Sequence, residues 1–168
     1  MHRRNFLKWA THGLGVVFGA IIGVPAIAYL IDPRNRPAPP SGFRAVGKLS
    51  ELTEGVPHQV VIRDVRWDAW TLHPNDEIGR IWLIKRDEKT VDAFTATCPH
   101  LGCSINYEAS DKLFLCPCHG GTFYLTGHKL RGPVPRGMDS LDCETDGDTI
   151  LVKYQSFKSA EPEKVLRA

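Results

Sequence analysis

Two short boxes of cysteine and histidine constrain this chain more than any other feature of its sequence. They read Cys98-Pro-His100-Leu-Gly-Cys103 and Cys116-Pro-Cys118-His119-Gly-Gly121, and they contain four of its five cysteines. Thiolate and imidazole groups at such close spacing are typical metal ligands. The fold must therefore bring two loops together around one metal centre, and the quartet suits a single iron–sulfur cluster.

Both boxes resemble those of the Rieske iron–sulfur proteins, whose pattern is C-x-H-x-G-C followed by C-x-C-H-G. The resemblance implies one [2Fe-2S] cluster, with Cys98 and Cys116 as thiolate ligands of one iron. It implies that His100 and His119 bind the other iron through imidazole nitrogens. Clusters of this class have potentials of about −150 to +300 mV. The potential is high for such a cluster because two neutral imidazoles replace two anionic thiolates.

The remaining cysteines separate this interpretation from a zinc site. A cysteine–histidine quartet at short spacing is also typical of structural zinc, which is the alternative. Zinc gives no reason for Cys103 and Cys118, whereas the Rieske resemblance implies that these two form a disulfide clamping the boxes. Such a disulfide needs an oxidising compartment. Cys143 alternates with Leu141, which predicts a free buried thiol on a strand, with a bond to another subunit as the alternative.

Residues after the second box bear on the potential of the cluster. Gly132-Pro133-Val134-Pro135 resembles the G-P-x-P loop that packs beside the cluster in the family. Many high-potential members read H-G-S-x-Y after the second box, where the serine and tyrosine hydroxyls bond sulfurs of the site. This chain reads His119-Gly-Gly121-Thr-Phe123, so both hydroxyls are missing. The resemblance therefore implies a potential in the lower half of the range, unless Thr122 or Tyr124 supplies a substitute.

The N-terminus combines a basic segment with a long apolar run. Residues 1–8 contain two arginines and a lysine and match the twin-arginine export motif R-R-x-F-L-K. A plain basic flank is the alternative, and both interpretations place the N-terminus in the cytoplasm. Residues 9–31 form a run without Asp, Glu, Lys or Arg, in which His12 is the one titratable interruption near the basic end. About 20 apolar residues span a bilayer. We predict a retained transmembrane anchor, because the apolar region of a cleaved signal covers only about 7–15 residues.

Residues 32–42 are predicted to be a tether between the anchor and the rest of the chain. Four of these eleven residues are prolines, which excludes helix and central strand. A polyproline-like segment of this length is on the order of 30 Å long. In the Rieske subunits of cytochrome bc complexes the equivalent stretch lets the head move between partners. The alternative is a passive spacer.

Residues 43–157 are predicted to form the iron–sulfur head, and residues 158–168 a C-terminal tail. Turns recur about every ten residues, and Asp146-Gly147 predicts a hairpin. The β-rich runs are residues 58–62, 81–84, 91–97, 113–115, 141–143 and 150–152. These runs predict an all-β antiparallel sandwich or barrel, and the resemblance implies a small cluster-binding subdomain. Residues 67–76 fit no strand pattern and are interpreted as an insertion that contacts a partner subunit.

The resemblance covers the export motif, the anchor, the tether, both boxes and the proline loop. It implies the iron–sulfur subunit of a quinol–cytochrome c oxidoreductase, without complete activity on its own. The expected partners are quinol, a cytochrome b-type membrane subunit, a cytochrome c-type haem protein and membrane lipid. His119 is the expected quinol contact and His100 the other candidate. The protein is expected in the bacterial inner membrane with its head on the periplasmic side.

Charge and two alternative functions complete these expectations. The chain has a net charge of +2, but residues 43–168 carry −2, which argues against nucleic acid as a partner.

One alternative function is that of the small Rieske subunit of a periplasmic oxidase such as arsenite oxidase, which has no quinol site. The other is a non-catalytic zinc module on a membrane stalk. Co-purification with a di-haem cytochrome b discriminates the first, and an electron paramagnetic resonance spectrum discriminates the second.

Overall fold

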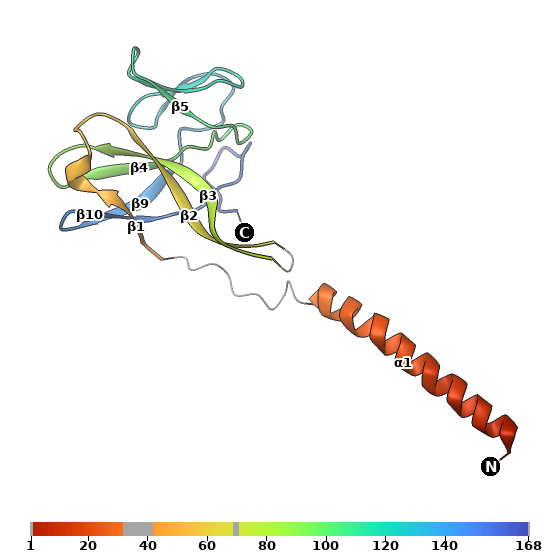
Figure 1. Cartoon of the computed structure of the whole chain (residues 1–168). Helices are drawn as coiled ribbons and strands as arrows, with labels where there is room; N and C mark the ends of the chain where they lie inside the picture. The colour runs from red at the N-terminus through yellow and green to blue at the C-terminus, as the bar shows by residue number, and fades with distance from the viewer. Residues whose placement is uncertain (1, 32–41, 69–70, 168) are drawn as a thin grey trace. The chain divides into compact units, whose positions relative to one another are not determined.

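The computed structural model describes residues 2–31, 42–68 and 71–167 (Figure 1). The chain divides into two compact units, residues 1–39 and 40–168, and each is described by itself. The predicted tether at residues 32–42 lies outside the described residues, apart from Gly42.

The described part of the first unit is dominated by helix α1 (Arg3–Ile31), which is 29 residues long. Its most apolar window of 18 residues has a mean hydropathy of 2.3, and none of that window is buried. By length and composition the helix is able to cross a membrane, as predicted for residues 9–31. Pro25 lies within the helix, a position that membrane helices tolerate.

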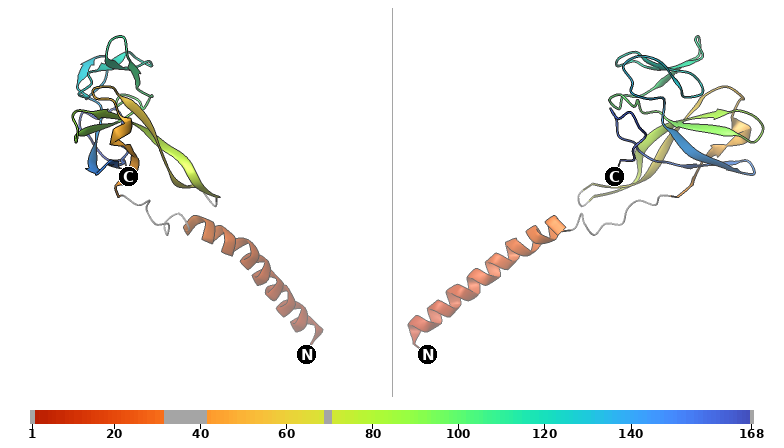
Figure 2. Two further views of the ribbon diagram at one scale, coloured as in Figure 1. Left: turned by 60° about the vertical axis from the view of Figure 1, so that its left-hand side comes forward. Right: turned by 180° about the vertical axis from the view of Figure 1, so that it is seen from behind.

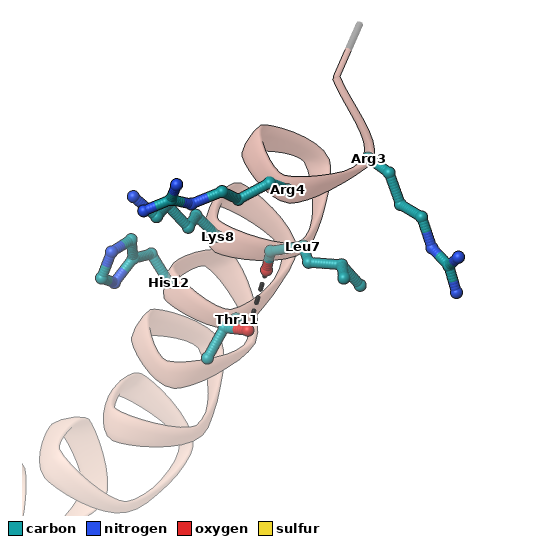
Figure 3. A pocket seen from close by; sticks show the side chains of 6 residues that line it. All are labelled: Arg3, Arg4, Leu7, Lys8, Thr11 and His12. Atoms are coloured by element: carbon teal, nitrogen blue, oxygen red, sulfur yellow. Dashed lines mark hydrogen bonds between the residues drawn. The ribbon is translucent and has the colours of Figure 1, made fainter.

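The basic N-terminal segment belongs to the same helix, which begins at Arg3 and not at residue 9. Arg4, Lys8 and His12 lie on one side of the first turns, and Arg3 points away from them (Figure 3). This follows from helical geometry, because residues four apart share a face. The Thr11 hydroxyl donates a hydrogen bond of 2.8 Å to the carbonyl oxygen of Leu7.

Six antiparallel strands form the larger sheet of the head, in the order β1-β10-β9-β4-β3-β2. They are β1 (Arg44–Lys48), β2 (His58–Asp68), β3 (Thr71–Lys85), β4 (Val91–Thr95), β9 (Ser140–Asp146) and β10 (Thr149–Lys153). The short 3-10 helix η2 (Leu49–Glu51) follows β1. An ion pair of 2.5 Å between Arg44 of β1 and Asp64 of β2 joins the two edge strands. The strongly curved sheet therefore approaches a closed barrel (Figure 2).

A second, four-stranded antiparallel sheet lies between β4 and β9 in the chain. Its strands follow the order β5 (Asn106–Glu108), β6 (Leu113–Cys116), β7 (Gly121–Phe123) and β8 (Lys129–Arg131). It forms a separate small layer at one end of the larger sheet (Figures 1 and 2). The predicted all-β fold with a small subdomain and one N-terminal apolar helix is confirmed.

Aromatic side chains join the two sheets. Trp82 of β3 packs against Phe114 of β6, with ring centroids 5.3 Å apart, and its indole N–H donates to the carbonyl oxygen of Ile105 at 3.0 Å. Phe94 of the larger sheet and Phe123 of the smaller one belong to the same buried cluster. Phe114 and Phe123 are fully buried, and each such side chain stabilises the fold by about 1.5–3 kcal/mol. The small subdomain is therefore fixed to the large sheet by a shared core.

The larger sheet has a core of its own, made of aliphatic side chains from its strands and η2. Its fully buried members are Ile81, Leu83, Ile150 and Val152. Their strands were among the predicted β-rich runs. The hairpin predicted at Asp146-Gly147 is present, but Gly147, with φ 57°, and Asp148 form its loop.

Residues 67–68 and 71–76 differ from the sequence interpretation, because the first two end β2 and the others begin β3. Trp67 pairs with Leu72, and the register shifts between Asp64 and Arg66. This part of the hairpin extends past β4, which pairs only with Ile81–Lys85 of β3. Among the described residues no third strand pairs with this end of the hairpin, and none of residues 71–76 is buried. These positions therefore lack the alternation of buried and exposed residues that marks a strand in sequence.

Candidate metal centre

The two boxes form a matched pair of loops. The first lies between β4 and β5, and the second connects β6 to β7. Gly102 N–H donates to the carbonyl oxygen of Cys98 at 2.9 Å, and Gly120 N–H donates to that of Cys116 at 3.1 Å. Both glycines have a positive φ, 82° and 70°, which L side chains rarely adopt. Each box is therefore a tight turn that depends on its glycine.

The four predicted ligands come together in two pairs. Cys98 and Cys116 are buried, with 1% and 2% of their surface exposed, and their thiols are in hydrogen-bonding contact. The rings of His100 and His119 lie 4.8 Å apart between centroids, with their planes at 81°. His119 is exposed and His100 is half-buried. The arrangement thus places two thiols inside and two imidazoles toward the surface.

The environment of Cys98 favours its neutral form unless a cation is present. Burial raises the pKa of its thiol to about 11, and the neighbouring Cys116 acts in the same direction. The backbone N–H groups of His100 and Leu101 donate hydrogen bonds to the Cys98 sulfur and oppose this shift. Metal binding requires the thiolate, so a bound cation must supply the compensating charge.

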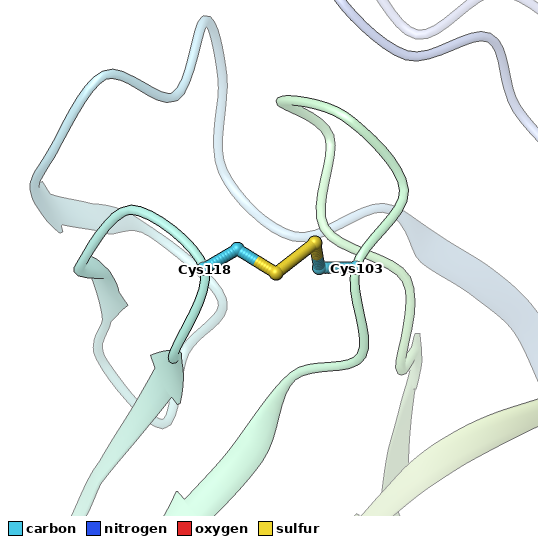
Figure 4. The surroundings of a disulfide bond; sticks show 2 residues. All are labelled: Cys103 and Cys118. Carbon is cyan, nitrogen blue, oxygen red and sulfur yellow. A yellow bond between two sulfur atoms is a disulfide. The ribbon is translucent and has the colours of Figure 1, made fainter.

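The disulfide implied for Cys103 and Cys118 is present and joins the two loops (Figure 4). Its Cα atoms are 6.6 Å apart, and Cys118 lies 15 positions after Cys103 in the chain. The sulfur of Cys116 lies within 4.8 Å of both disulfide sulfurs. The covalent link is therefore next to a predicted ligand and holds the loops at a fixed separation.

The proline loop packs directly on the second box. A Cβ atom built on Gly132 would lie 2.7 Å from the Cα of Gly121 and 3.0 Å from the carbonyl oxygen of Gly120. Val134 is buried, with 2% of its surface exposed, and its carbonyl oxygen accepts a hydrogen bond of 2.6 Å from Lys129 Nζ. The loop thus covers the glycine pair of the second box, which supports its predicted shielding role.

The two proposed substitutes for the missing hydroxyls have other surroundings. The Thr122 hydroxyl donates to the carbonyl oxygen of Gly120 at 3.1 Å and accepts from Arg131 Nε at 3.3 Å. Tyr124 is 47% exposed, and Phe123 is fully buried in the shared core. The hydrogen bond that Thr122 can donate is thus already used within the loop.

Cys143 lies in β9 and is a free thiol, as predicted, but it is half-buried and not fully buried. Burial raises its pKa to about 11, and the negative charges of Asp92 and Glu144 add to the shift. It pairs with Val152 in the larger sheet. Its position on the larger sheet separates it from the cysteine-rich loops.

Sequence reasoning missed the contacts behind the first box. Arg136, which follows the proline loop, forms a two-pronged ion pair with Asp139, and both side chains are nearly buried. Ala160 N–H donates to the carbonyl oxygen of Pro99 at 2.8 Å. No motif marks these residues, because their contacts join segments far apart in the chain. Only the loop preceding Arg136 carried a recognisable pattern.

This donor set fits a [2Fe-2S] cluster with mixed ligands. Two soft thiols suit iron in such a cluster, and two imidazoles provide nitrogen ligands without adding negative charge. The disulfide gives the two further cysteines a role that a zinc quartet does not require. The chemistry of the donors and the clamp therefore agree with the cluster expected from the boxes.

Comparison with known proteins gives a family match that covers the head. Residues 43–143 match the Rieske [2Fe-2S] domain. The chain is 30% identical over 161 residues to the cytochrome b6-f complex iron-sulfur subunit of Synechococcus sp., covering 89% of this chain and 86% of the relative. It is 29% identical over 136 residues to the menaquinol:cytochrome c reductase iron-sulfur subunit of Bacillus subtilis, covering 79% of each.

The matches among solved structures include one further Rieske protein. The cyanobacterial plasma membrane Rieske protein PetC3 from Synechocystis PCC 6803 aligns with a TM-score of 0.49 and 26% identity. The alignment covers 66% of this chain and 99% of that protein.

Proposed function

The chain belongs to the Rieske [2Fe-2S] family, and on that premise we propose which residues hold the cluster and which reaction they serve. Cys98 and Cys116 would bind one iron as thiolates, and His100 and His119 would bind the other. When bound, the cluster supplies a one-electron carrier of raised potential. The observation that carries this proposal is the pair of touching buried thiols in loops that also bring two imidazoles together.

The protein is an electron-transfer subunit of a cytochrome bc-type complex, as its relatives are. We infer the finer steps from the same relatives. The subunit takes electrons from quinol, works beside a cytochrome b-type subunit and delivers electrons to a cytochrome c-type haem. It has no complete activity alone, because the quinol-binding membrane subunit and the electron acceptor are separate proteins.

His119 is proposed to contact quinol, with His100 as the second candidate. His119 is exposed, so its ring is accessible to a substrate at the surface of the head. When deprotonated, the ring nitrogen that would not bind iron could accept a hydrogen bond from the quinol hydroxyl and take up its proton. The half-buried ring of His100 offers less access to the same substrate.

Helix α1 is proposed to be a retained, single-pass anchor in the bacterial inner membrane. Its length and apolarity suit a bilayer, and its basic residues cluster at the N-terminal end. Positive charges favour the cytoplasmic side, so the N-terminus would lie there and the head on the outer side. An oxidising outer compartment also suits the Cys103–Cys118 disulfide.

Electron paramagnetic resonance of the purified, reduced full chain tests the cluster assignment. We expect the signal of a mixed-ligand [2Fe-2S] cluster, and its loss in Cys98→Ala. Cys143→Ala is the matched control, because it removes a free thiol of the larger sheet, and it should keep the signal. A metal-loaded wild-type protein without this signal would contradict the assignment and favour zinc.

The quinol reaction is tested in the membrane complex. We expect a cytochrome b-type protein to co-purify with the chain, and quinol to reduce the cluster within that complex. Reduction by quinol that requires the complex supports the proposed role. A partner without cytochrome b, together with no quinol-dependent reduction, would favour the periplasmic oxidase alternative.

A further inference from the structure

The back of the first box borders a polar cavity of about 280 Å³. Cys98, Pro99 and Gly102 form part of its wall, and Thr95 also lines it. The Thr95 hydroxyl is buried and has no hydrogen-bond partner among the described residues. Because a cavity provides few packing contacts, this side of the loop depends on directed hydrogen bonds for its position.

The C-terminal segment supplies such a bond. After Phe157 the chain turns back on itself, with Lys158 N–H donating to the carbonyl oxygen of Val165 at 2.8 Å. Within this turn, Ala160 N–H donates to the carbonyl oxygen of Pro99 at 2.8 Å. Pro99 lies between Cys98 and His100, so this contact holds the loop between two of its proposed ligands.

Arg136 holds the C-terminal segment in place. Its guanidinium donates to the carbonyl oxygen of Glu161 at 2.6 Å and to that of Lys158 at 2.8 Å. It also donates twice to the carboxylate of Asp139, at 2.8 Å each. The carbonyl oxygen of Asp139 in turn accepts from Thr95 N–H at 2.9 Å. One nearly buried guanidinium thus ties the C-terminal segment to the end of β4.

We propose that Arg136 and the C-terminal segment 158–167 form a brace that sets the position of Cys98 and His100, with Arg136 as a positioning residue. This inference rests on the proposed ligand assignment. The brace runs from β4 through Asp139 and Arg136 to the segment, and from its Ala160 amide to Pro99. It supports the first box from behind, whereas the disulfide supports it from the side of the second box.

The brace is expected to act on the potential through the Cys98 sulfur. The backbone N–H groups of His100 and Leu101 donate to that sulfur, and they belong to the braced loop. Such donors stabilise negative charge, and the reduced cluster carries more of it than the oxidised one. A loosened loop should therefore disfavour reduction and lower the midpoint potential.

To test the brace, the purified full chain and its Arg136→Gln variant are compared by redox titration and by electron paramagnetic resonance. We expect the equilibrium constant for reduction to fall at least about threefold in Arg136→Gln. This corresponds to a midpoint potential about 28 mV lower, since a tenfold change in the constant is about 59 mV for one electron. We also expect altered g-values. Arg136→Lys keeps the charge opposite Asp139 but lacks the planar fork, so it should show a smaller shift. Arg136→Lys replaces Arg136→Gln as the test variant if Arg136→Gln does not fold.

Two further variants separate positioning from general stability. Deletion of residues 158–168 leaves the Arg136–Asp139 pair but removes the bond to Pro99, so it should reproduce the shift of Arg136→Gln. Arg86→Gln is the control, because Arg86 also links segments, donating to Asp92 at 2.6 Å and to the Leu125 carbonyl oxygen at 2.7 Å. Neither partner belongs to the first box, so this variant should lower the melting temperature without changing g-values.

Each outcome bears on one inference. Arg136 variants that keep the native potential and g-values and lose only thermal stability overturn the brace. The same holds if Arg86→Gln shifts the spectrum as much as Arg136→Gln does. A wild-type protein that binds no [2Fe-2S] cluster instead overturns the ligand assignment, so the two failures are distinguishable.

Discussion

Val134 occupies the space that a side chain at Gly121 would need. A Cβ atom built on Gly121 lies 2.8 Å from Cγ1 of Val134, closer than real Cβ contacts come. Gly121 is buried in β7, and Val134 in the proline loop is 2% exposed. The second box and the proline loop therefore depend on a small residue on one side and a branched residue on the other.

Gly121→Ser is expected to destabilise the head by about 1–3 kcal/mol, the usual cost of overpacking. The collision is with a buried methyl group, which has little room to move. The double variant with Val134→Ala in the same chain should cost less than the two single changes added together, because it removes that methyl group. Thermal unfolding of both single variants and of the double variant measures the effect. Losses that simply add would show that Val134 is not the obstacle.

The native cluster is expected to have a midpoint potential in the lower half of about −150 to +300 mV. Glycine and phenylalanine replace the two hydroxyl donors, and each missing bond could lower the potential by about 60–120 mV. The hydrogen bond that Thr122 can donate goes to the carbonyl oxygen of Gly120. Such a potential suits a low-potential quinol such as menaquinol.

Redox titration of the native chain checks this value, beside the combined variant Gly121→Ser, Val134→Ala and Phe123→Tyr. Val134→Ala alone is the control for loosened packing. We expect the combined variant to have the higher potential. A native potential near the top of the range, or no rise in the combined variant, would defeat the explanation.

Cys103→Ser should weaken retention of the cluster. A disulfide that closes a loop of 15 residues is worth about 3 kcal/mol in the chain-entropy account, and this one joins the two ligand-bearing loops. The visible absorption of the cluster should disappear at a lower temperature than in the wild type. Cys143→Ser is the control that leaves the clamp intact. Unchanged retention in Cys103→Ser would show that the clamp has no such role.

Replacing both Arg3 and Arg4 by lysine tests the export route. The helix places these residues in its first turn, and lysine keeps their charge. If the twin-arginine pathway reads them, the variant should accumulate in the cytoplasm, as measured by cell fractionation. Replacing Lys8 by arginine is the control. Normal membrane insertion of the double variant would mean that the arginines only orient the helix.

The sequence determined the parts of this protein whose chemistry is local. The ligand boxes, the apolar run and the alternating strands each depend on residues close together in the chain. Helix α1 and the strands of the larger sheet that were read from β-rich runs therefore agree with prediction. The small subdomain and the Cys103–Cys118 disulfide agree with what the Rieske resemblance implied. The strand ends at residues 67–68 and 71–76 were missed, because residues 71–76 lack the buried face that makes a strand recognisable.

Only the tertiary structure decided the contacts between distant segments. Arg136 reaches the carbonyl oxygens of Lys158 and Glu161, and Val134 fills the space beside Gly121. Such contacts depend on where loops meet in three dimensions, and neither spacing nor composition records that meeting. Sequence thus indicated which residues are proposed to hold a cluster, because ligand chemistry belongs to the residues themselves. Tertiary packing decided what supports those residues, because support comes from chain segments that only folding brings near.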